Sequence, residues 1–158
     1  MREVAVLLLF TLLLNGCSSY SAPTAQTAAS GVWSAQLPGG DGEASGFSFT
    51  TQFTVNSDGT LSITYFQFLT AGTCFPVSGG AQTGTMTLTT NTTTNAVTGT
   101  FTYSVQSSGN TLTLDGTVTG TASTTTTLSG GSITGTWSLT GGTGCNAASG
   151  SFTMTQTS

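Results

Sequence analysis

The sequence predicts an all-β protein: an antiparallel up-and-down meander of about eight strands that forms a small barrel, with a flattened β-sandwich as the alternative. Apolar and polar residues alternate with a period of two in successive segments after residue 31, which is typical of half-buried strands. Turn sequences such as Asn56-Ser57-Asp58-Gly59 separate these segments. Threonine, a β-branched residue that favours strands, is abundant, and nothing after Cys17 shows helical periodicity.

The expected strands follow from this alternation, taken in order. The first covers residues 32–37, and the second has inward-facing Phe47, Phe49, Phe53 and Val55. In the third, apolar residues switch from odd to even positions after Tyr65, which predicts a β-bulge there or a strand that is apolar on both faces. The remaining strands are expected around residues 86–88, 97–105, 112–118, 133–139 and 152–154.

A weak internal repeat supports closure of the sheet. Gly31, Trp33 and other residues recur 104 positions later, with Trp137 matching Trp33. We therefore expect the first and last hairpins to lie side by side where the sheet closes. The runs Gly31-Val32-Trp33 and Gly135-Thr136-Trp137 resemble the Gly-x-Trp strands of lipocalins and avidins, a resemblance that implies a ligand-holding barrel but carries over no ligand residue.

The N-terminal residues predict a lipid anchor. An apolar run over residues 4–14 is too short to span a membrane and is typical of a signal peptide. It ends in Leu14-Asn15-Gly16-Cys17, which resembles the lipobox of bacterial lipoproteins and implies cleavage before a lipidated Cys17. The alternative is an ordinary secretory signal followed by a chance cysteine.

The lipoprotein resemblance divides the chain into a signal peptide (1–16), a lipidated tether (17–30) and a barrel-like domain (31–158). Ser18 replaces the aspartate that retains members of that family at the inner membrane, so the resemblance implies the outer membrane of the bacterial envelope. The whole chain also resembles small Thr/Gly-rich lipoproteins of environmental bacteria.

Charge excludes several classes of function. After residue 16 the chain has no lysine, arginine or histidine, so it lacks the cations for nucleic-acid binding and the bases for Ser-His-Asp or Cys-His catalysis. Carboxylate chemistry of the glycosidase kind remains, but the neighbouring Asp41 and Glu43 lie in a glycine-rich stretch. We interpret that pair as a solvated loop, with weak divalent-cation binding or catalysis as alternatives, and expect no enzyme activity, cofactor or metal site.

The remaining cysteines, Cys74 and Cys145, are expected to form a disulfide. Both follow odd-numbered strands of the meander, so both connections lie at the same end of the barrel. Two free thiols are the alternative. A disulfide there would strap the end farthest from the lipid anchor and argue against an open cavity.

Three functional hypotheses follow. The favoured one is a lipid-anchored envelope protein with a structural or interaction role, in contact with the membrane and with an envelope protein, glycan or small apolar ligand at its distal loops. The second is a binding module for an apolar small molecule or a glycan, with Tyr65, Phe66, Phe68 and Phe75 as candidate contacts or, alternatively, core residues. The third is a carboxylate-only hydrolase; oligomeric state is left open.

Overall fold

The structure is a computed structural model that describes residues 24–39, 46–122, 127–146 and 148–157. Within these residues it has one short helix and eight strands, which confirms the all-β prediction. In chain order the elements are α1 (Ala25–Ala29), β1 (Gly31–Pro38), β2 (Gly46–Val55), β3 (Leu61–Thr70), β4 (Ala81–Thr90), β5 (Ala96–Ser107), β6 (Asn110–Ala122), β7 (Leu128–Thr140) and β8 (Ala148–Gln156).

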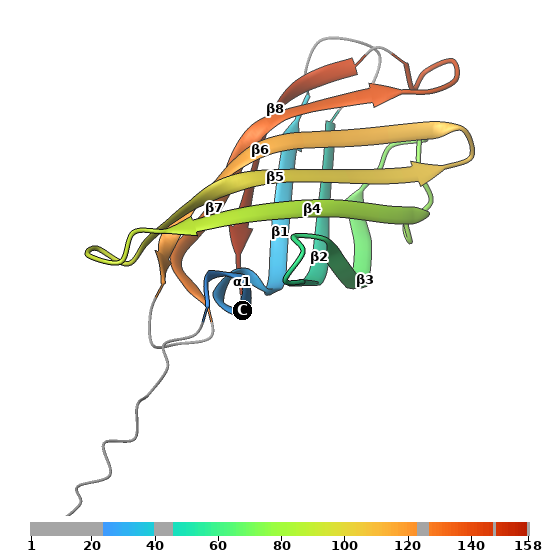
Figure 1. The fold of residues 1–158 in the computed structure, drawn as a ribbon. Coiled ribbons are helices and arrows are strands. Elements are labelled where there is room, and N and C mark those ends of the chain that lie inside the picture. The colour runs from blue at the N-terminus through green and yellow to red at the C-terminus, as the bar shows by residue number, and fades with distance from the viewer. Residues whose placement is uncertain (1–23, 40–45, 123–126, 147, 158) are drawn as a thin grey trace, which may run out of the picture.

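The strands form one antiparallel sheet in the order β3-β2-β1-β8-β7-β6-β5-β4. Each strand lies beside its predecessor in the chain except β4, and the first strand pairs with the last, with Trp33 opposite Gln156. Figure 1 shows β1 to β3 crossing steeply behind β4 to β6, so the sheet curls round on itself. The predicted meander is therefore a nearly closed, barrel-shaped sheet.

The edges of the sheet meet between β3 and β4. A backbone hydrogen bond of 2.7 Å runs from the Met86 N–H to the Gly59 carbonyl, and Thr60 forms an isolated bridge with Thr85. These contacts come from the β2–β3 turn and not from a ladder between the two strands. The β1–β8 pairing was expected from the repeat, whereas the incomplete seam at β3 and β4 was not.

The expected bulge in β3 is present. The register of β2 with β3 shifts between Gln52 and Phe53, which leaves Thr64 as an extra residue before Tyr65. Inward-facing residues of β3 are consequently odd-numbered before the bulge and even-numbered after it. A second register shift in the same pair makes Leu69 an extra residue near the end of the strand.

Aromatic side chains fill the interior and join its two halves. The rings of Phe49 and Tyr103, from β2 and β5, stack at a centroid distance of 5.9 Å, and those of Phe53 and Phe101 lie 6.3 Å apart. Such pairs stabilise a fold by about 0.5–1.5 kcal/mol beyond the area they bury. The largest fully buried side chains are Trp33, Trp137, Tyr103, Phe49, Phe53, Phe101, Leu37, Met86, Leu112, Leu114, Ile133 and Leu139.

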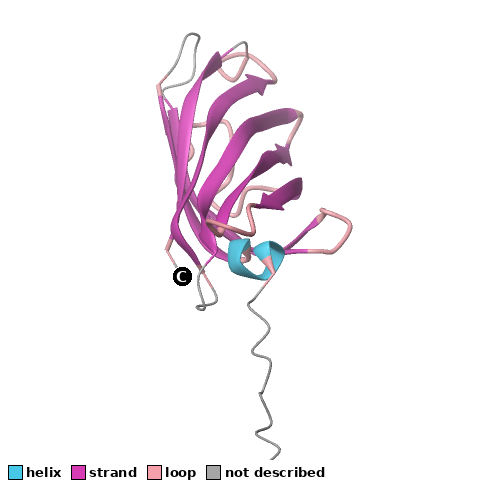
Figure 2. Cartoon of the chain, turned by 60° about the vertical axis from the view of Figure 1, so that its left-hand side comes forward, coloured by secondary structure: helices cyan, strands magenta, loops and turns pink. Residues whose placement is uncertain are grey.

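Helix α1 closes the end of the barrel at which β1 begins (Figure 2). Thr24 caps the helix by accepting a hydrogen bond from the Thr27 N–H, and Ala28 and Ala29 are fully buried. The Trp33 Nε1–H donates to the Ala29 carbonyl at 3.0 Å. Residues 24–30, which we expected in the tether, therefore belong to the packed domain.

The two halves of the internal repeat differ in register. Trp33 lies opposite Thr51 in the first hairpin, whereas Trp137 lies opposite Gly150 in the last. The residue that corresponds to Thr51 by the 104-residue offset is Thr155. The hairpins share sequence and are neighbours through β1 and β8, but they are not copies of one paired unit.

Candidate functional site

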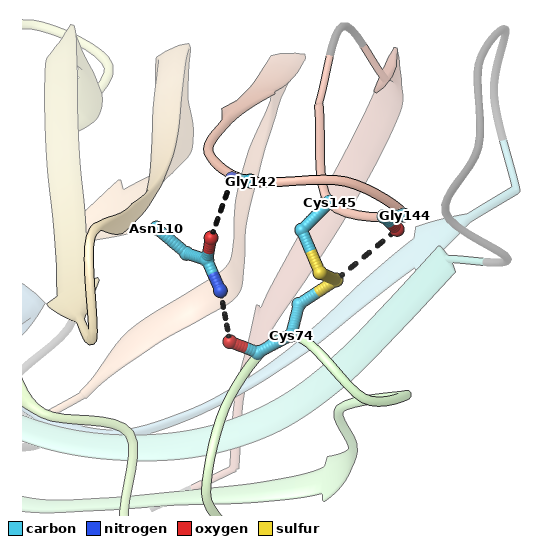
Figure 3. Close-up of a disulfide and its surroundings, with 5 residues drawn as sticks. All are labelled: Cys74, Asn110, Gly142, Gly144 and Cys145. Carbon is cyan, nitrogen blue, oxygen red and sulfur yellow. Dashed lines mark hydrogen bonds between the residues drawn. A yellow bond between two sulfur atoms is a disulfide. The ribbon is translucent and has the colours of Figure 1, made fainter.

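The end of the barrel opposite α1, which we call the mouth, is strapped by a disulfide. Cys74 and Cys145 are bonded with their Cα atoms 5.5 Å apart, and both are almost fully buried. The loops that carry them follow β3 and β7, as expected from strand parity. The predicted disulfide is present in the structure (Figure 3).

Asn110, the first residue of β6, ties the same two loops together. Its Nδ2 donates to the Cys74 carbonyl at 2.7 Å, and its Oδ1 accepts from the Gly142 N–H at 3.1 Å. Figure 3 shows the amide beside the disulfide, between the two loops. One side chain at the start of β6 thus connects both sides of the covalent strap.

The loop after β3 also covers the seam next to β4. The Phe68 N–H, on the free edge of β3, donates to the Val77 carbonyl at 2.8 Å. The ring of Phe75, in the same loop, packs 5.2 Å from that of Phe68 and 5.9 Å from that of Phe47. The disulfide therefore holds a loop that replaces part of the missing β3–β4 ladder.

The four aromatic residues proposed as ligand contacts do not converge on one cavity. Phe68 and Phe75 are core residues, and the ring of Phe66 packs 4.9 Å from that of Phe49. Tyr65 is 45% exposed on the outer face, where its hydroxyl hydrogen-bonds to Gln67. Phe66, Phe68 and Phe75 therefore belong to the core or pack against it, whereas the Tyr65 side chain lies on the outer face of the sheet.

A buried polar bridge crosses the interior behind the seam. The Thr51 hydroxyl donates to the Tyr65 carbonyl at 3.1 Å and lies 2.9 Å from the Tyr103 hydroxyl. Since the proton of Thr51 is used, the Tyr103 hydroxyl is the donor in the second bond. Burial raises the pKa of Tyr103, which keeps its phenol protonated. These two hydrogen bonds connect the Tyr65 carbonyl, at the bulge in β3, through Thr51 on β2 to Tyr103 on β5.

An open cleft of about 510 Å³ lies at the seam. Its walls include Leu61 from β3, Gln82 and Gly84 from β4, and Tyr103 and Ser104 from β5. These side chains are uncharged, so the cleft presents hydroxyl, amide and apolar groups only.

The acidic residues do not form a reactive pair in the described part of the chain. Asp58 lies in the β2–β3 turn, where hydrogen bonds from the Thr60 side chain and backbone lower its pKa. Asp115 is exposed in the middle of β6. Asp41 and Glu43 lie outside the described residues, as does Cys17.

Neither a metal-binding cluster nor a membrane-spanning helix is present among the described residues. They contain no group of three or more histidine, cysteine, aspartate or glutamate side chains that could hold a metal ion. The helix among them is too short and insufficiently apolar to cross a membrane.

Comparisons with protein-family models, with curated proteins and with solved structures find no significant match. The functional argument therefore depends on the residues of this chain.

Sequence reasoning missed three residues whose side-chain hydrogen bonds organise the barrel, two at its ends and one in its interior. Asn110 was unremarkable as a polar residue in a turn after Gly109, and Thr51 looked like one more inward position in an alternating strand. Gln156 is the third, since its Nε2 donates to the carbonyls of Ala28 and Ser30 at 2.9 Å each. The available signal for Thr51 was a hydroxyl at an inward position of an apolar strand, because a buried hydroxyl needs a hydrogen-bond partner.

Proposed function

We propose that the chain is a lipid-anchored protein of the bacterial cell envelope, attached through Cys17, with a structural or interaction role and no catalytic activity. The tetrapeptide Leu14-Asn15-Gly16-Cys17 carries this proposal. Two or three acyl chains at about 0.8 kcal/mol per buried methylene would hold the protein on a membrane. The outer membrane is the proposed location, because Ser18 is not the aspartate associated with inner-membrane retention.

The arrangement of the domain fits an anchored protein. Helix α1, which follows the proposed tether, lies at the opposite end of the barrel from the Cys74–Cys145 disulfide. An anchor at the N-terminus would therefore turn the strapped mouth away from the membrane. We propose that envelope proteins or glycans contact the loops of the mouth, since loops on a rigid scaffold commonly carry binding residues.

The packing of the interior favours a structural or interaction role over a carrier role. Aromatic and aliphatic side chains from both halves of the sheet occupy the space in which a lipocalin-like ligand would lie. After residue 16 the chain has no histidine or lysine, so only carboxylates could act as general bases, and the two in the described residues, Asp58 and Asp115, lie in separate elements.

Metabolic labelling with palmitate tests the anchor. The full-length chain should incorporate label and fractionate with membranes, and Cys17→Ser should abolish both. Ser19→Ala, two residues away, is the matched control and should behave as the parent chain. Unchanged labelling of Cys17→Ser would overturn the proposal.

The location has a separate test. Ser18→Asp should remain labelled but move from the outer-membrane to the inner-membrane fraction on a density gradient. If the parent chain is already in the inner-membrane fraction, the proposed location is wrong while the anchor stands.

A second candidate function, binding of a small neutral glycan or apolar molecule, rests on the 510 Å³ cleft at the seam, a size within the range of ligand pockets. Chemical-shift changes at Gln82 and Ser104 on addition of neutral oligosaccharides would support it. Changes confined to the mouth loops would contradict it.

A further inference from the structure

The outer face of β4 to β8 carries a regular grid of hydroxyl groups. The outward-facing positions within residues 83–89, 98–104, 113–119, 132–138 and 149–155 lie opposite one another at four successive levels across the five strands. We call these positions the hydroxyl grid. Asp115 is the single position of the grid that is neither threonine nor serine.

One level of the grid consists of threonine alone. The register pairs its members in a continuous row, and all of them are exposed: Thr87, Thr100, Thr117, Thr134 and Thr153. Neighbouring strands are about 4.7–4.9 Å apart, and alternate residues of one strand are about 6.6–6.8 Å apart. The grid therefore repeats in two dimensions.

Threonine makes such a grid more rigid than serine would. Its β-branched side chain has a restricted χ1 angle, so the hydroxyl and the methyl group both keep defined positions on the sheet. Cross-strand hydrogen bonding can fix them further, since the hydroxyl oxygens of Thr85 and Thr102 lie 2.8 Å apart. Each threonine of the grid then presents one polar and one apolar group in a fixed arrangement.

The chemistry of the grid limits what can bind it. An isolated hydroxyl gains little over water when it bonds a dissolved ligand, because the exchange of hydrogen bonds is nearly balanced. The grid adds no aromatic ring for stacking on sugars and no cation for anions. Anions and stacked sugar rings therefore gain little from the grid, and a ligand gains most if it repeats on the scale of the grid, so that many small contributions add together.

We propose that the hydroxyl grid binds the surface of ice. Ice is neutral, its oxygen atoms repeat in two dimensions at spacings of a few ångströms, and it accepts and donates hydrogen bonds as a hydroxyl does. Strand twist of about 20–25° per neighbour limits a flat match to adjacent strands, which places the strongest contact at the centre of the grid. The central residues are Thr100, Thr117 and Thr134 on β5 to β7.

The inference is independent of the lipid anchor, because the grid belongs to the barrel. An anchored protein with this face would attach the envelope to ice, and a released one would adsorb to growing crystals.

Ice-affinity partition tests the proposal. The full-length chain carrying Cys17→Ser is frozen slowly onto a cold surface, and its content in the ice is compared with that in the remaining liquid. We expect enrichment in the ice and faceted growth of single crystals in its presence. Exclusion of the protein from the ice, together with unshaped crystals, would overturn the inference.

A pair of substitutions locates the surface. Thr117→Tyr, at the centre of the grid, should reduce ice uptake to that of a non-binding protein, because the larger side chain breaks the regular surface. Thr54→Tyr is the matched control at an exposed position of β2 outside the grid and should retain uptake. Equal uptake by both variants would contradict the assignment. Circular dichroism checks folding, and Thr134→Tyr replaces Thr117→Tyr if the latter does not fold.

Discussion

The two ends of the barrel are closed by different means. At the α1 end, hydrogen bonds join α1 and the residue after it to three strands. The Trp33 indole and the Gln156 amide donate to carbonyls of residues 28–30. The Val55 N–H donates to the Ser30 hydroxyl at 2.9 Å. At the mouth, the disulfide links the loops that follow β3 and β7, and Asn110 at the start of β6 hydrogen-bonds to both of them. Hydrogen bonds thus close the α1 end, and a covalent bond reinforces the mouth at the opposite end.

The two buried tryptophans show the same contrast. The Trp33 Nε1–H, at the α1 end, has the Ala29 carbonyl as acceptor. The Trp137 Nε1–H, nearer the mouth, is buried without a hydrogen-bond partner, and its ring packs edge-on against Phe47 at 5.6 Å. Among the described residues, the one buried side-chain polar atom without a hydrogen-bond partner therefore lies toward the mouth.

The largest expected effect comes from removing the covalent strap. Cys74→Ser with Cys145→Ser opens a link across a sequence separation of 71 residues, which should lower the free energy of unfolding by about 4 kcal/mol in the chain-entropy model. Urea unfolding of the double variant measures the loss. The parent protein under reducing conditions should match it, and an unchanged midpoint in both would show that the mouth does not depend on the disulfide.

The next largest losses of stability are expected from removing the side-chain amides that hydrogen-bond at the two ends of the barrel, Gln156 at the α1 end and Asn110 at the mouth. Gln156→Ala removes two hydrogen bonds to part-buried carbonyls and the acceptor of the Leu128 N–H, so we expect the free energy of unfolding to fall by about 3 kcal/mol.

Asn110→Ala should lower the free energy of unfolding by about 1 kcal/mol while the disulfide holds the same loops, and by more after reduction. Urea unfolding with and without reductant measures both. Equal costs for Asn110→Ala in the two conditions would mean that the amide and the disulfide act independently.

A smaller difference is expected between Trp33→Phe and Trp137→Phe. Both reduce the volume of a buried ring, but only the first leaves a buried carbonyl, that of Ala29, without its donor. Trp33→Phe should therefore be more destabilising by about 1–2 kcal/mol. Thermal unfolding of the matched pair tests this expectation, which fails if Trp137→Phe is the less stable variant.

The smallest effect concerns Asp58, in the β2–β3 turn at the α1 end. Because its pKa is lowered in the folded state by Thr60, its contribution to stability is present above the ordinary pKa and is lost as the pH falls through the lowered one. Thr60→Ala should move the pKa of Asp58 upward toward its ordinary value. NMR titration of the carboxyl group measures the shift, and Asn91→Ala, in the β4–β5 turn at the same end, should leave it unchanged.

Local alternation was sufficient to predict most of the sheet. The switch from odd to even inward positions near Tyr65 predicted the bulge, because a one-residue insertion moves later side chains to the other face. Strand parity likewise showed that the disulfide expected from the two remaining cysteines is allowed, since connections after odd strands share one end. Both inferences use relations that the chain order alone determines.

Other features depend on relations between distant strands. The seam between β3 and β4 follows from the curl of the whole sheet, and no residue in either strand signals it. Helix α1 has five residues, too few for periodicity, although Thr24 before an alanine-rich segment is a recognisable cap. The role of Asn110 depends on two loops that lie far from it in sequence.

The hydroxyl grid was visible in the sequence only as an abundance of threonine. Alternation predicted that these residues face outward, but their alignment into rows requires the register of four strand pairs. A shift of one residue in any pair would move the threonines of one strand to the inner face.

The position of β1 within the sheet has a mechanical consequence. Because β1 is hydrogen-bonded to β2 on one side and to β8 on the other, tension applied through the N-terminus loads two ladders at once. A strand at the sheet margin would instead peel away one bond at a time. Under a pulling force applied at the N-terminus, the domain should therefore resist rupture until both flanking ladders yield together.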